Sequence, residues 1–267
     1  MKAKVVHIIV GLNDGGAEGV MSRLCIHSPL FEHVVISLSG EGKHGPILKE
    51  SGISVHCLHL DQGLKSYHNI FKLASLLKFE KPDVVQTWMY HADLIGGVIS
   101  RLMGIRNIYW GVRHSVLDKE STKRTTILIA YLCAYLSKAV PKKIICCAHK
   151  ALESHVEIGY YRSKMHTIRN GYDLKKFSPD LSKRKFIRDA LKIDESTFLI
   201  GNVGRFNKNK DHKNLLLALA LLEKRGLRFS CVLVGSGISG ENLYLTKLIT
   251  SLNLQNKIQF LGQRDDI

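Results

Sequence analysis

Two basic side chains stand where a short apolar segment gives way to a helical pattern. Arg205 follows the segment TFLIGNV and Gly204, and Lys210 comes directly before a helical pattern at 211–224. Cations beside the N-terminus of a helix, together with the backbone N–H groups there, can neutralise a diphosphate leaving group. The segment therefore predicts a diphosphate site, with simply solvated lysine and arginine side chains as the alternative.

Glycine-rich turns follow two other apolar segments. Gly15 and Gly16 belong to the first turn, where glycine lets a ligand approach the backbone at a helix N-terminus. Their spacing differs from G-x-G-x-x-G, which disfavours a dinucleotide site and leaves a turn without a ligand as the alternative. Gly235 and Gly237 do begin a G-x-G-x-x-G match, after the segment CVLV. A lone match on the second strand of its domain is a weak signal for a nicotinamide cofactor.

Histidines mark two more predicted strand ends. His91 follows the segment QTWMY, and His114 follows WGVR, which places Arg113 beside it. Ligands of α/β proteins bind at the carboxyl ends of strands, so this shared location favours a role in a site for both histidines. The chain has 13 histidines, and a packed or solvent-facing ring is the alternative for each. No cluster of side chains has the spacing of metal ligands, so we expect no metal.

The positive charge is concentrated in one part of the chain. The formal net charge is +16, and residues 111–185 hold 16 basic and 6 acidic side chains. From charge alone, the partner is a nucleic acid, an anionic membrane or a phosphorylated small molecule. Lys119, Lys123 and Arg124 lie at the start of an apolar helical pattern at 122–138, a combination that suits attachment to a membrane surface. Burial of this helix against a sheet is the alternative.

The elements that must position these residues alternate along the chain. Short β-branched segments alternate with longer helical patterns, and the near-continuously apolar strands indicate a parallel sheet covered on both faces. We therefore predict an α/β, doubly wound domain. Its predicted strands are Val5–Val10, His33–Leu38, Ile53–Leu58, Asp83–Thr87, Asn107–Gly111, Lys143–Cys146 and His166–Arg169. Its predicted helices lie near 17–28, 45–51, 67–79, 92–103, 122–138 and 148–158.

A polar connection separates this domain from a second one. Asn170-Gly171 and Pro179 mark a turn and a connection. The alternation then restarts, with strands at 197–203, 228–234 and 257–261 and helices at 211–224 and 241–252. We predict a complete N-terminal, acceptor-side Rossmann-like domain at 1–172, a linker at 173–182 and an incomplete second Rossmann-like domain at 183–267. Three strands are few for such a domain, so we expect the chain to end within it.

The composition is that of a packed globular protein, with 45% apolar residues. Six cysteines without a C-x-x-C pair favour a reduced, cytoplasmic chain. The first apolar run is too short for a signal-peptide core, and the longest, Ile127–Leu136, is too short to span a bilayer.

Taken in order, these segments resemble the retaining glycosyltransferases of family 4, whose GT-B architecture has two Rossmann-like domains. The resemblance covers essentially the whole chain, and QTWMYHAD with WGVRHS is similar to the branch acting on surface polysaccharides. The segments that carry it are Gly-Gly-Ala-Glu at 15–18, QTWMYHADLIGG at 86–97, WGVRHS at 110–115, Ile168–Asp173 with Phe177 and Pro179, Val203–Arg205 with Lys210, Val234–Gly237 and Phe260–Gly262.

The resemblance implies transfer of a hexose, with retention and without a metal, from a nucleotide-diphospho-sugar to a lipid-linked glycan acceptor. Together with the cysteine usage, the basic segment and the apolar helix at 122–138, this leads us to expect a cytoplasmic protein, peripheral on the inner face of the plasma membrane, with no nucleic acid partner. The residues that match donor-binding positions are Gly15, Gly16, Arg205, Lys210, Gly235 and Gly237. His114 matches a catalytic position near the acceptor and the transferred sugar, and His91 matches one less closely. Arg113, Lys119, Lys123 and Arg124 are expected to face the acceptor and the membrane.

The chain departs from the family pattern after Phe260–Gly262. The family carries beyond that point two glutamates separated by seven residues and further glycine-rich turns, and this chain ends before them. We therefore expect a truncated form that is inactive alone. A nucleotide-sugar epimerase of the same fold, a nicotinamide enzyme and a non-catalytic remnant that binds anionic surfaces are the alternatives.

Overall fold

The computed structural model describes residues 2–61, 69–114, 117, 122–175, 177–264 and 266. The chain divides into two compact units, residues 1–172 (unit 1) and residues 173–267 (unit 2). None of the described helices has the length and apolar character needed to cross a membrane.

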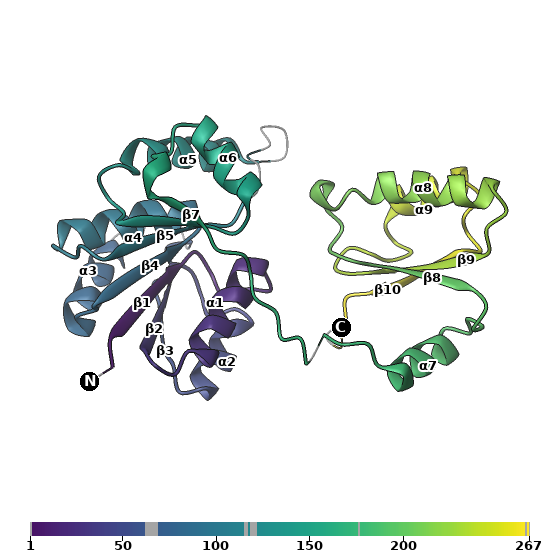
Figure 1. Cartoon of the computed structure of the whole chain (residues 1–267), viewed down its shortest axis with the longest axis horizontal. Helices are drawn as coiled ribbons and strands as arrows, with labels where there is room; N and C mark the ends of the chain where they lie inside the picture. The colour runs from purple at the N-terminus through teal and green to yellow at the C-terminus, as the bar shows by residue number, and fades with distance from the viewer. Residues whose placement is uncertain are drawn as a thin grey trace. The chain divides into compact units, whose positions relative to one another are not determined.

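Unit 1 is built on a parallel sheet of seven strands in the order β3-β2-β1-β4-β5-β6-β7 (Figure 1). The strands are β1 (Lys4–Ile9), β2 (Glu32–Ser37), β3 (Ser54–Cys57), β4 (Val84–Trp88), β5 (Ile108–Val112), β6 (Lys143–Cys146) and β7 (Met165–Thr167). The strand order reverses between β1 and β4, so the crevice at their carboxyl ends is where such a fold binds ligands. The doubly wound prediction is confirmed.

Helices cover both faces of this sheet. The helices are α1 (Gly16–His27), α2 (His44–Glu50), α3 (Asn69–Glu80), α4 (Tyr90–Leu102), α5 (Arg124–Leu136) and α6 (His149–Glu157), with a short 3-10 helix, η2 (Arg162–Lys164). Side chains of α1 and α2 pack with Ile9 on one face, whereas side chains of α3 and α4 pack with Ile8 on the other. Because neighbouring residues of a strand point to opposite faces, both faces need apolar side chains, which explains the near-continuous apolar strands.

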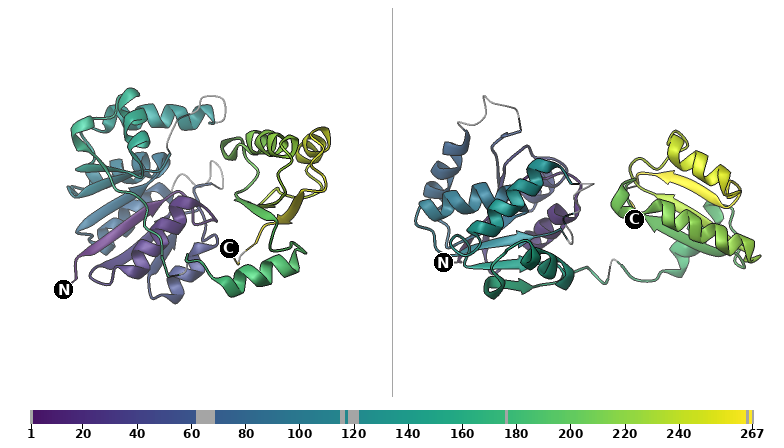
Figure 2. Two further views of the ribbon diagram at one scale, coloured as in Figure 1. Left: turned by 45° about the vertical axis from the view of Figure 1, so that its right-hand side comes forward. Right: turned by 90° about the horizontal axis from the view of Figure 1, so that it is seen from above.

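Unit 2 is a smaller parallel sheet in the order β10-β9-β8, drawn from further sides in Figure 2. Its strands are β8 (Phe198–Val203), β9 (Phe229–Val234) and β10 (Ile258–Gly262), and its helices are α7 (Leu181–Ala190), η3 (Lys208–Lys210), α8 (His212–Lys224) and α9 (Leu243–Ser251). Figure 1 shows α8 and α9 on one face of the sheet and α7 on the other. Leu216 and Leu245 pack against Leu233 of β9 in the core of this unit.

The helix α7 has no counterpart in the sequence prediction, which places a linker at 173–182 and begins the second domain's elements with the strand at 197–203. Asp180 caps the helix by accepting hydrogen bonds from the backbone N–H groups of Ser182 and Lys183. The guanidinium of Arg188 is buried and donates to the carbonyls of Asp194 and Thr197. The helix is thus held by a buried arginine instead of an apolar stripe, and apolar periodicity does not detect such a helix.

Candidate functional site

The carboxyl edge of the unit 1 sheet gathers the residues that the sequence singles out. Gly15 and Gly16 follow β1, His91 lies in the first turn of α4 after β4, and Arg113 and His114 follow β5. Parallel strands place all their carboxyl ends at the same edge. Of the other predicted residues, Lys123 and Arg124 begin α5, and Lys119 lies outside the described residues.

The two glycines of the turn between β1 and α1 differ in how much space surrounds them. A Cβ added at Gly15 would lie 2.2 Å from an Oε atom of Glu18, so the Glu18 carboxylate covers that residue. Apart from its chain neighbours and the backbone of its own helix, no described residue has an atom within 4 Å of the position of a Cβ at Gly16. Gly16 is therefore the more open of the two toward a ligand at the helix N-terminus.

Arg113 is held in place at this edge by an aromatic ring and an amide. Its guanidinium lies over the ring of Trp88, 4.4 Å from the centroid, and its Nη1 donates to Oδ1 of Asn170 at 2.8 Å. Among the described residues its buried Nε has no hydrogen-bond partner. A guanidinium fixed on an aromatic face is ready to bind an anionic or hydroxyl-rich ligand without first losing side-chain freedom.

Trp88 is in turn fixed by a buried chain of hydrogen bonds. Its indole N–H donates to Nδ1 of His7 at 3.2 Å. His7 Nε2 then donates to Nδ1 of His33 at 3.0 Å, and His33 Nε2 donates to the carbonyl of Ser28 at 3.1 Å. Because an indole N–H can only donate and a carbonyl can only accept, both ring tautomers are determined. Burial lowers the pKa of His7 to about 3, so this ring is neutral at physiological pH.

The same two histidines and Cys25 have ligand atoms within 4.8 Å of one another, a spacing that could hold a metal ion. A metal on Nε2 of neutral His7 would require the ring proton on Nδ1. That nitrogen faces the N–H of Trp88, which is also a donor. The hydrogen-bonded chain therefore suits these residues better than a bound metal does.

His114 is supported by a second aromatic arrangement. Its exposed ring stacks on Tyr90, with 5.3 Å between the centroids and 12° between the planes. The buried Tyr90 hydroxyl donates to Nε2 of His155 at 2.5 Å, since His155 Nδ1 donates to the carbonyl of Ala151 at 2.6 Å. Desolvation lowers the pKa of His114, which favours a neutral ring. A neutral ring can both donate a hydrogen bond to a sugar hydroxyl and accept one from it.

Within the described ranges His91 forms no hydrogen bond or ring stack, unlike His114. Its side chain is half-buried, and its pKa is lowered first by desolvation and then by the charge of Lys123. The residue before Tyr90, Met89, adopts φ 70° and ψ 160°, a backbone conformation that few residues other than glycine adopt. Strain of this kind often occurs where a backbone is held for function, and here it lies at the end of β4.

Asp93 lies beneath these residues and is fully buried. Its Oδ1 accepts hydrogen bonds from Thr87 Oγ1 at 2.5 Å and from the backbone N–H of Gly111 at 3.3 Å, which joins β4 to β5. Its Oδ2 has no partner among the described residues. Burial raises the pKa of Asp93 to about 7, against the opposing effects of these hydrogen bonds and of Arg113.

We expect the free energy of unfolding of the Asp93→Asn variant to increase, relative to that of the unaltered protein, as pH rises from 4 to 7. The carboxyl ionises at pH about 4 in the unfolded chain but near 7 in the folded one. Its contribution to stability is therefore fully present below the unfolded pKa and is lost as pH rises through the folded pKa. The difference in free energy of unfolding should change by about 1.4 kcal/mol per pH unit, measured by urea unfolding at pH 5 and pH 7.5. A difference independent of pH would contradict the assignment.

In unit 2 two glycine turns pack directly against each other. Gly235 has φ 147°, and a Cβ there would lie 2.3 Å from the carbonyl oxygen of Gly204. The backbone N–H of Phe206 donates to the Ser236 carbonyl at 2.7 Å, and a Cβ at Gly237 would lie 3.1 Å from the Cβ of Phe206. The glycines at 235 and 237 are therefore needed for this packing, whether or not a ligand binds.

Arg205 and Lys210 stand exposed beside these turns. Neither side chain forms a hydrogen bond or ion pair within the described ranges, and the Lys210 methylenes pack beside Gly204. Asp211 ends η3 in a left-handed conformation and caps α8 by accepting from the N–H of Asn214. The structure thus places two uncompensated cations at a strand end and a helix start, an arrangement suited to a diphosphate.

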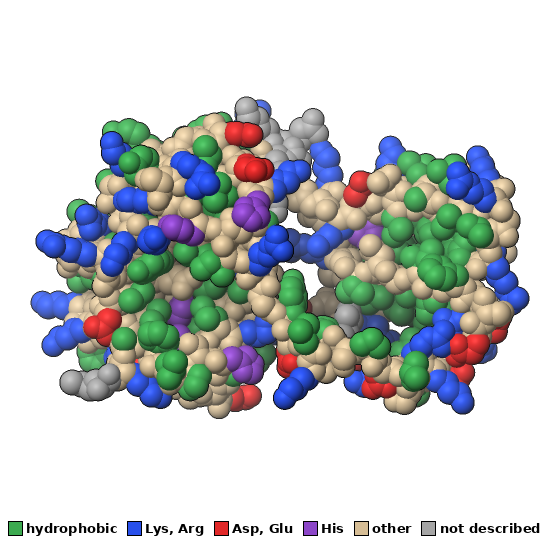
Figure 3. All heavy atoms as spheres, viewed as in Figure 1, with side chains coloured by type: hydrophobic (Ala, Val, Ile, Leu, Met, Phe, Trp, Pro, Cys, Tyr) green, Lys and Arg blue, Asp and Glu red, His purple; other side chains and the backbone are tan. Residues whose placement is uncertain are grey.

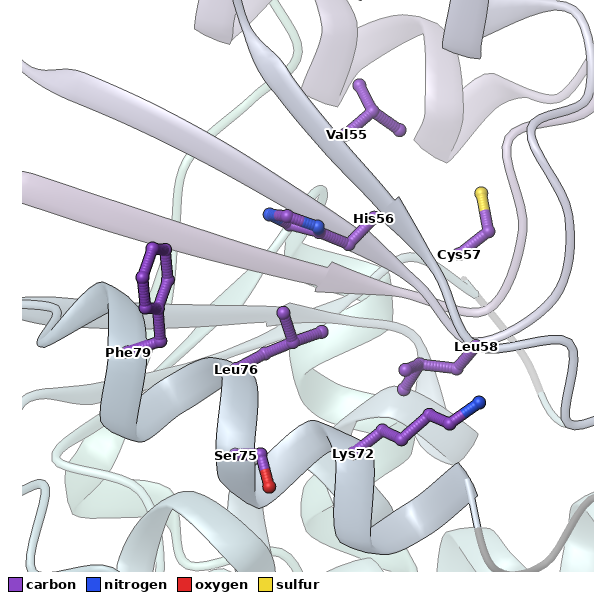
Figure 4. Close-up of a pocket in the computed structure, with 8 residues that line it drawn as sticks. All are labelled: Val55, His56, Cys57, Leu58, Lys72, Ser75, Leu76 and Phe79. Atoms are coloured by element: carbon purple, nitrogen blue, oxygen red, sulfur yellow. The ribbon is translucent and has the colours of Figure 1, made fainter.

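A further hollow of about 550 Å³ lies on unit 1 away from this edge (Figure 4). The side chains in Figure 4 come from β3, α3 and the residue after β3, so the hollow lies beside the edge strand β3 of the sheet. Its lining is Val55, His56, Cys57, Leu58, Lys72, Ser75, Leu76 and Phe79. With one lysine and an apolar wall, it offers less to a diphosphate than the edges described above.

Sequence reasoning assigns no individual role to Trp88, Tyr90 or Asp93, although all three lie within QTWMYHADLIGG. Nor does it find His7 and His155, which reach the site from the middle of a strand and from another helix. The one available signal is a carboxylate and two aromatic residues at the junction of a strand and a helix.

Two family models together match nearly all of the chain. The model described as Glycosyltransferase Family 4 matches residues 15–176, and the model described as Glycosyl transferases group 1 matches residues 183–267. Among curated proteins, the Escherichia coli UDP-Gal:alpha-D-GlcNAc-diphosphoundecaprenol alpha-1,3-galactosyltransferase is 28% identical over 209 residues, covering 76% of this chain and 53% of that protein. The glycosyltransferase EpsF of Bacillus subtilis is 24% identical over 286 residues, covering 99% and 69%. The chain thus spans about half the length of the first relative.

Solved structures show the same fold. HepE of Anabaena in complex with UDP superposes with a TM-score of 0.81 at 20% identity, over 99% of this chain and 70% of that one. A UDP-N-acetylglucosamine 2-epimerase from Rickettsia bellii superposes less well, with a TM-score of 0.54 at 17% identity, over 98% and 69%. At these identities the likeness establishes the GT-B fold and nothing finer.

Proposed function

The chain belongs to glycosyltransferase family 4, and from this premise we propose that it takes part in moving a hexose from a nucleotide-diphospho-sugar to a glycan acceptor. The observation that carries the proposal is the pair of unpaired cations, Arg205 and Lys210, beside the glycine turns of unit 2. Such a pair can bind the diphosphate of the donor and neutralise the charge that develops on it as the sugar leaves. The UDP complex of HepE supports a donor of this class.

We assign the acceptor side to the carboxyl edge of unit 1. Arg113 on Trp88 and His114 on Tyr90 are held by buried partners, so their polar atoms are positioned before a ligand arrives. Neutral His114 can hold a hydroxyl of the acceptor or of the transferred sugar. Positioning of this kind supplies much of the rate of a group transfer, and it suits a retaining, metal-free reaction in which the departing phosphate assists the attacking hydroxyl. The E. coli relative, named for a diphosphoundecaprenol substrate, supports a lipid-linked acceptor.

The direct test is turnover. Because the chain of 267 residues is expected to be inactive alone, the test uses a longer form of the protein in which unit 2 is extended beyond residue 267. This form is incubated with UDP-hexoses and a short-chain polyprenyl-diphosphate glycan, and the release of nucleoside diphosphate and the formation of the glycosylated lipid are both followed. Formation of the lipid product supports the proposal, and the anomeric configuration of the new bond tests retention. Interconversion of UDP-sugars without any acceptor would instead support an epimerase, the alternative that the weaker fold likeness raises.

The outer face of α5 supports attachment of the same unit to a membrane. Four large side chains are exposed at the helical spacing i, i+3, i+4 and i+7, namely Leu128, Tyr131, Leu132 and Tyr135. Lys123 and Arg124 lie at the start of this helix and Lys138 just after its end. An exposed apolar stripe with basic residues at both ends suits the interface of an anionic bilayer.

We expect replacement of Lys119, Lys123 and Arg124 by Gln to release the protein from anionic vesicles, because each such cation contributes about 1 kcal/mol at an anionic surface. Cosedimentation with phosphatidylglycerol-containing vesicles measures this, and added salt should weaken the binding. The matched control removes three exposed cations of unit 2, with Gln at Lys213, Lys224 and Arg225. Equal binding of the unaltered protein to neutral and anionic vesicles would contradict the expectation.

A further inference from the structure

A basic pocket lies at the opposite, amino-terminal edge of the unit 1 sheet. It measures about 460 Å³ and is bounded by the loops that lead into β5 and β6. Four of its eight lining residues are cations, Arg101, Arg106, Lys142 and Lys164, and no carboxylate lines it. Figure 3 shows Lys and Arg side chains gathered over the region where α4 lies.

The charge of this pocket is not balanced by the protein. Within the described part of the chain none of the four cations forms an ion pair; Lys142 Nζ donates to Asn107 Oδ1 at 2.9 Å instead. Lys164 Nζ donates to the carbonyls of Lys138 and Pro141 at 2.5 and 2.6 Å, so its ammonium is held by the connection between α5 and β6. Burial and then the charge of Arg101 lower the pKa of Lys164, as expected for cations that repel one another across a pocket without an anion.

Exposed apolar side chains lie within a few residues of the pocket lining along the chain. Leu102 and Met103 follow Arg101 at the end of α4 and are 82% and 37% exposed. Tyr135, 84% exposed, lies in the last turn of α5, and the ring of Tyr161 lies under Lys138, with Nζ 5.8 Å from the centroid. A hollow rich in cations, with exposed leucine, methionine and tyrosine side chains close to its lining residues along the chain, combines the two features of a site for a lipid headgroup.

We propose that this basic pocket binds the phosphate headgroup of an anionic glycerophospholipid, with Leu102 and Tyr135 entering the bilayer interface beside it. The charge of the pocket requires an anion, and the adjoining apolar side chains favour an anion that is part of a membrane over one that is free in solution. The inference rests on the proposed attachment of unit 1 to a membrane. It adds a defined headgroup site at the end of α5 that lies far from Lys123 and Arg124 along the helix.

The test compares two variants that lose the same charge. Arg101→Gln with Arg106→Gln removes two exposed cations of the pocket, and Lys224→Gln with Arg225→Gln removes two of unit 2. We expect the first pair to bind vesicles of phosphatidylcholine with 20% phosphatidylglycerol roughly 10- to 30-fold more weakly, and the second pair to bind within about threefold of the unaltered protein. Equal losses of vesicle affinity in both variants would show that the protein binds through its net positive charge, and would refute headgroup binding at the pocket.

Two further measurements distinguish a lipid headgroup from a free phosphate, and a failure of this inference from a failure of the proposed function. Inorganic phosphate should displace the protein from vesicles more effectively than chloride at equal ionic strength. Binding of phosphate that needs Arg101 and Arg106, together with vesicle binding that does not, would assign the pocket to a soluble anion and overturn the lipid. Turnover with a water-soluble acceptor should be unchanged in Arg101→Gln/Arg106→Gln. Absence of turnover in the form with unit 2 extended, with pocket-dependent vesicle binding intact, would refute the proposed function alone.

Discussion

Replacing either Arg205 or Lys210 with alanine should weaken the binding of uridine diphosphate by roughly 10- to 150-fold, because each charge-assisted contact contributes about 1.5–3 kcal/mol. Both side chains are exposed and form no hydrogen bond or ion pair within the described structure, so their removal breaks no polar contact of unit 2. The effect should therefore appear in affinity and leave the melting temperature unchanged. Titration calorimetry with uridine and guanosine diphosphates measures it.

The matched control is Lys213→Ala, an exposed lysine in the first turn of α8 close to Lys210 in sequence. If it lowers affinity as much as Lys210→Ala, the diphosphate responds to the general positive field of this segment. Unchanged affinity in both Arg205→Ala and Lys210→Ala would refute the donor assignment. The loss should also shrink as salt increases, since exposed charges are screened.

The fold could be predicted from the sequence because most elements carry their own local signal. Strands such as β1 and β9 are unbroken apolar runs, and their alternation with helical patterns leaves a doubly wound sheet as the simplest solution. The helix α7 could not be predicted in this way, because Arg188 takes the place of an apolar core residue and bonds to carbonyls beyond the end of the helix.

The same distinction applies to the site. His91, Arg113 and His114 could be placed at one edge because each follows a predicted strand, and strand ends in a parallel sheet share an edge. Their supports could not be predicted, because His7 and His155 reach Trp88 and Tyr90 through contacts across 81 and 65 residues of chain. Sequence spacing does not reveal such contacts. Only the folded structure shows that buried histidines hold the rings of Trp88 and Tyr90 in place.

His114→Ala should lower turnover by about 10²- to 10³-fold, the usual loss when one positioned hydrogen-bonding group is removed from a site of group transfer. Affinity for the nucleoside diphosphate should change little, because His114 belongs to unit 1 and the diphosphate cations to unit 2. Turnover is measured in the form with unit 2 extended beyond residue 267, with a nucleotide sugar and the lipid acceptor, and is expressed per folded molecule. His166→Ala, which alters an exposed histidine of β7 to which no role is assigned, is the matched control and should leave turnover unchanged.

Variants of Tyr90 separate a positioned His114 from a merely packed one. Tyr90→Phe keeps the ring under His114 but leaves Nε2 of His155 buried without a donor, so it should reduce stability by about 1–3 kcal/mol and largely preserve turnover per folded molecule. Tyr90→Leu removes the ring as well and should lower turnover toward that of His114→Ala. If Tyr90→Leu loses stability but turns over as fast as Tyr90→Phe, the stack does not position His114. If His114→Ala itself only lowers stability, the histidine is structural, and Arg113 alone remains as the fixed polar group of this edge.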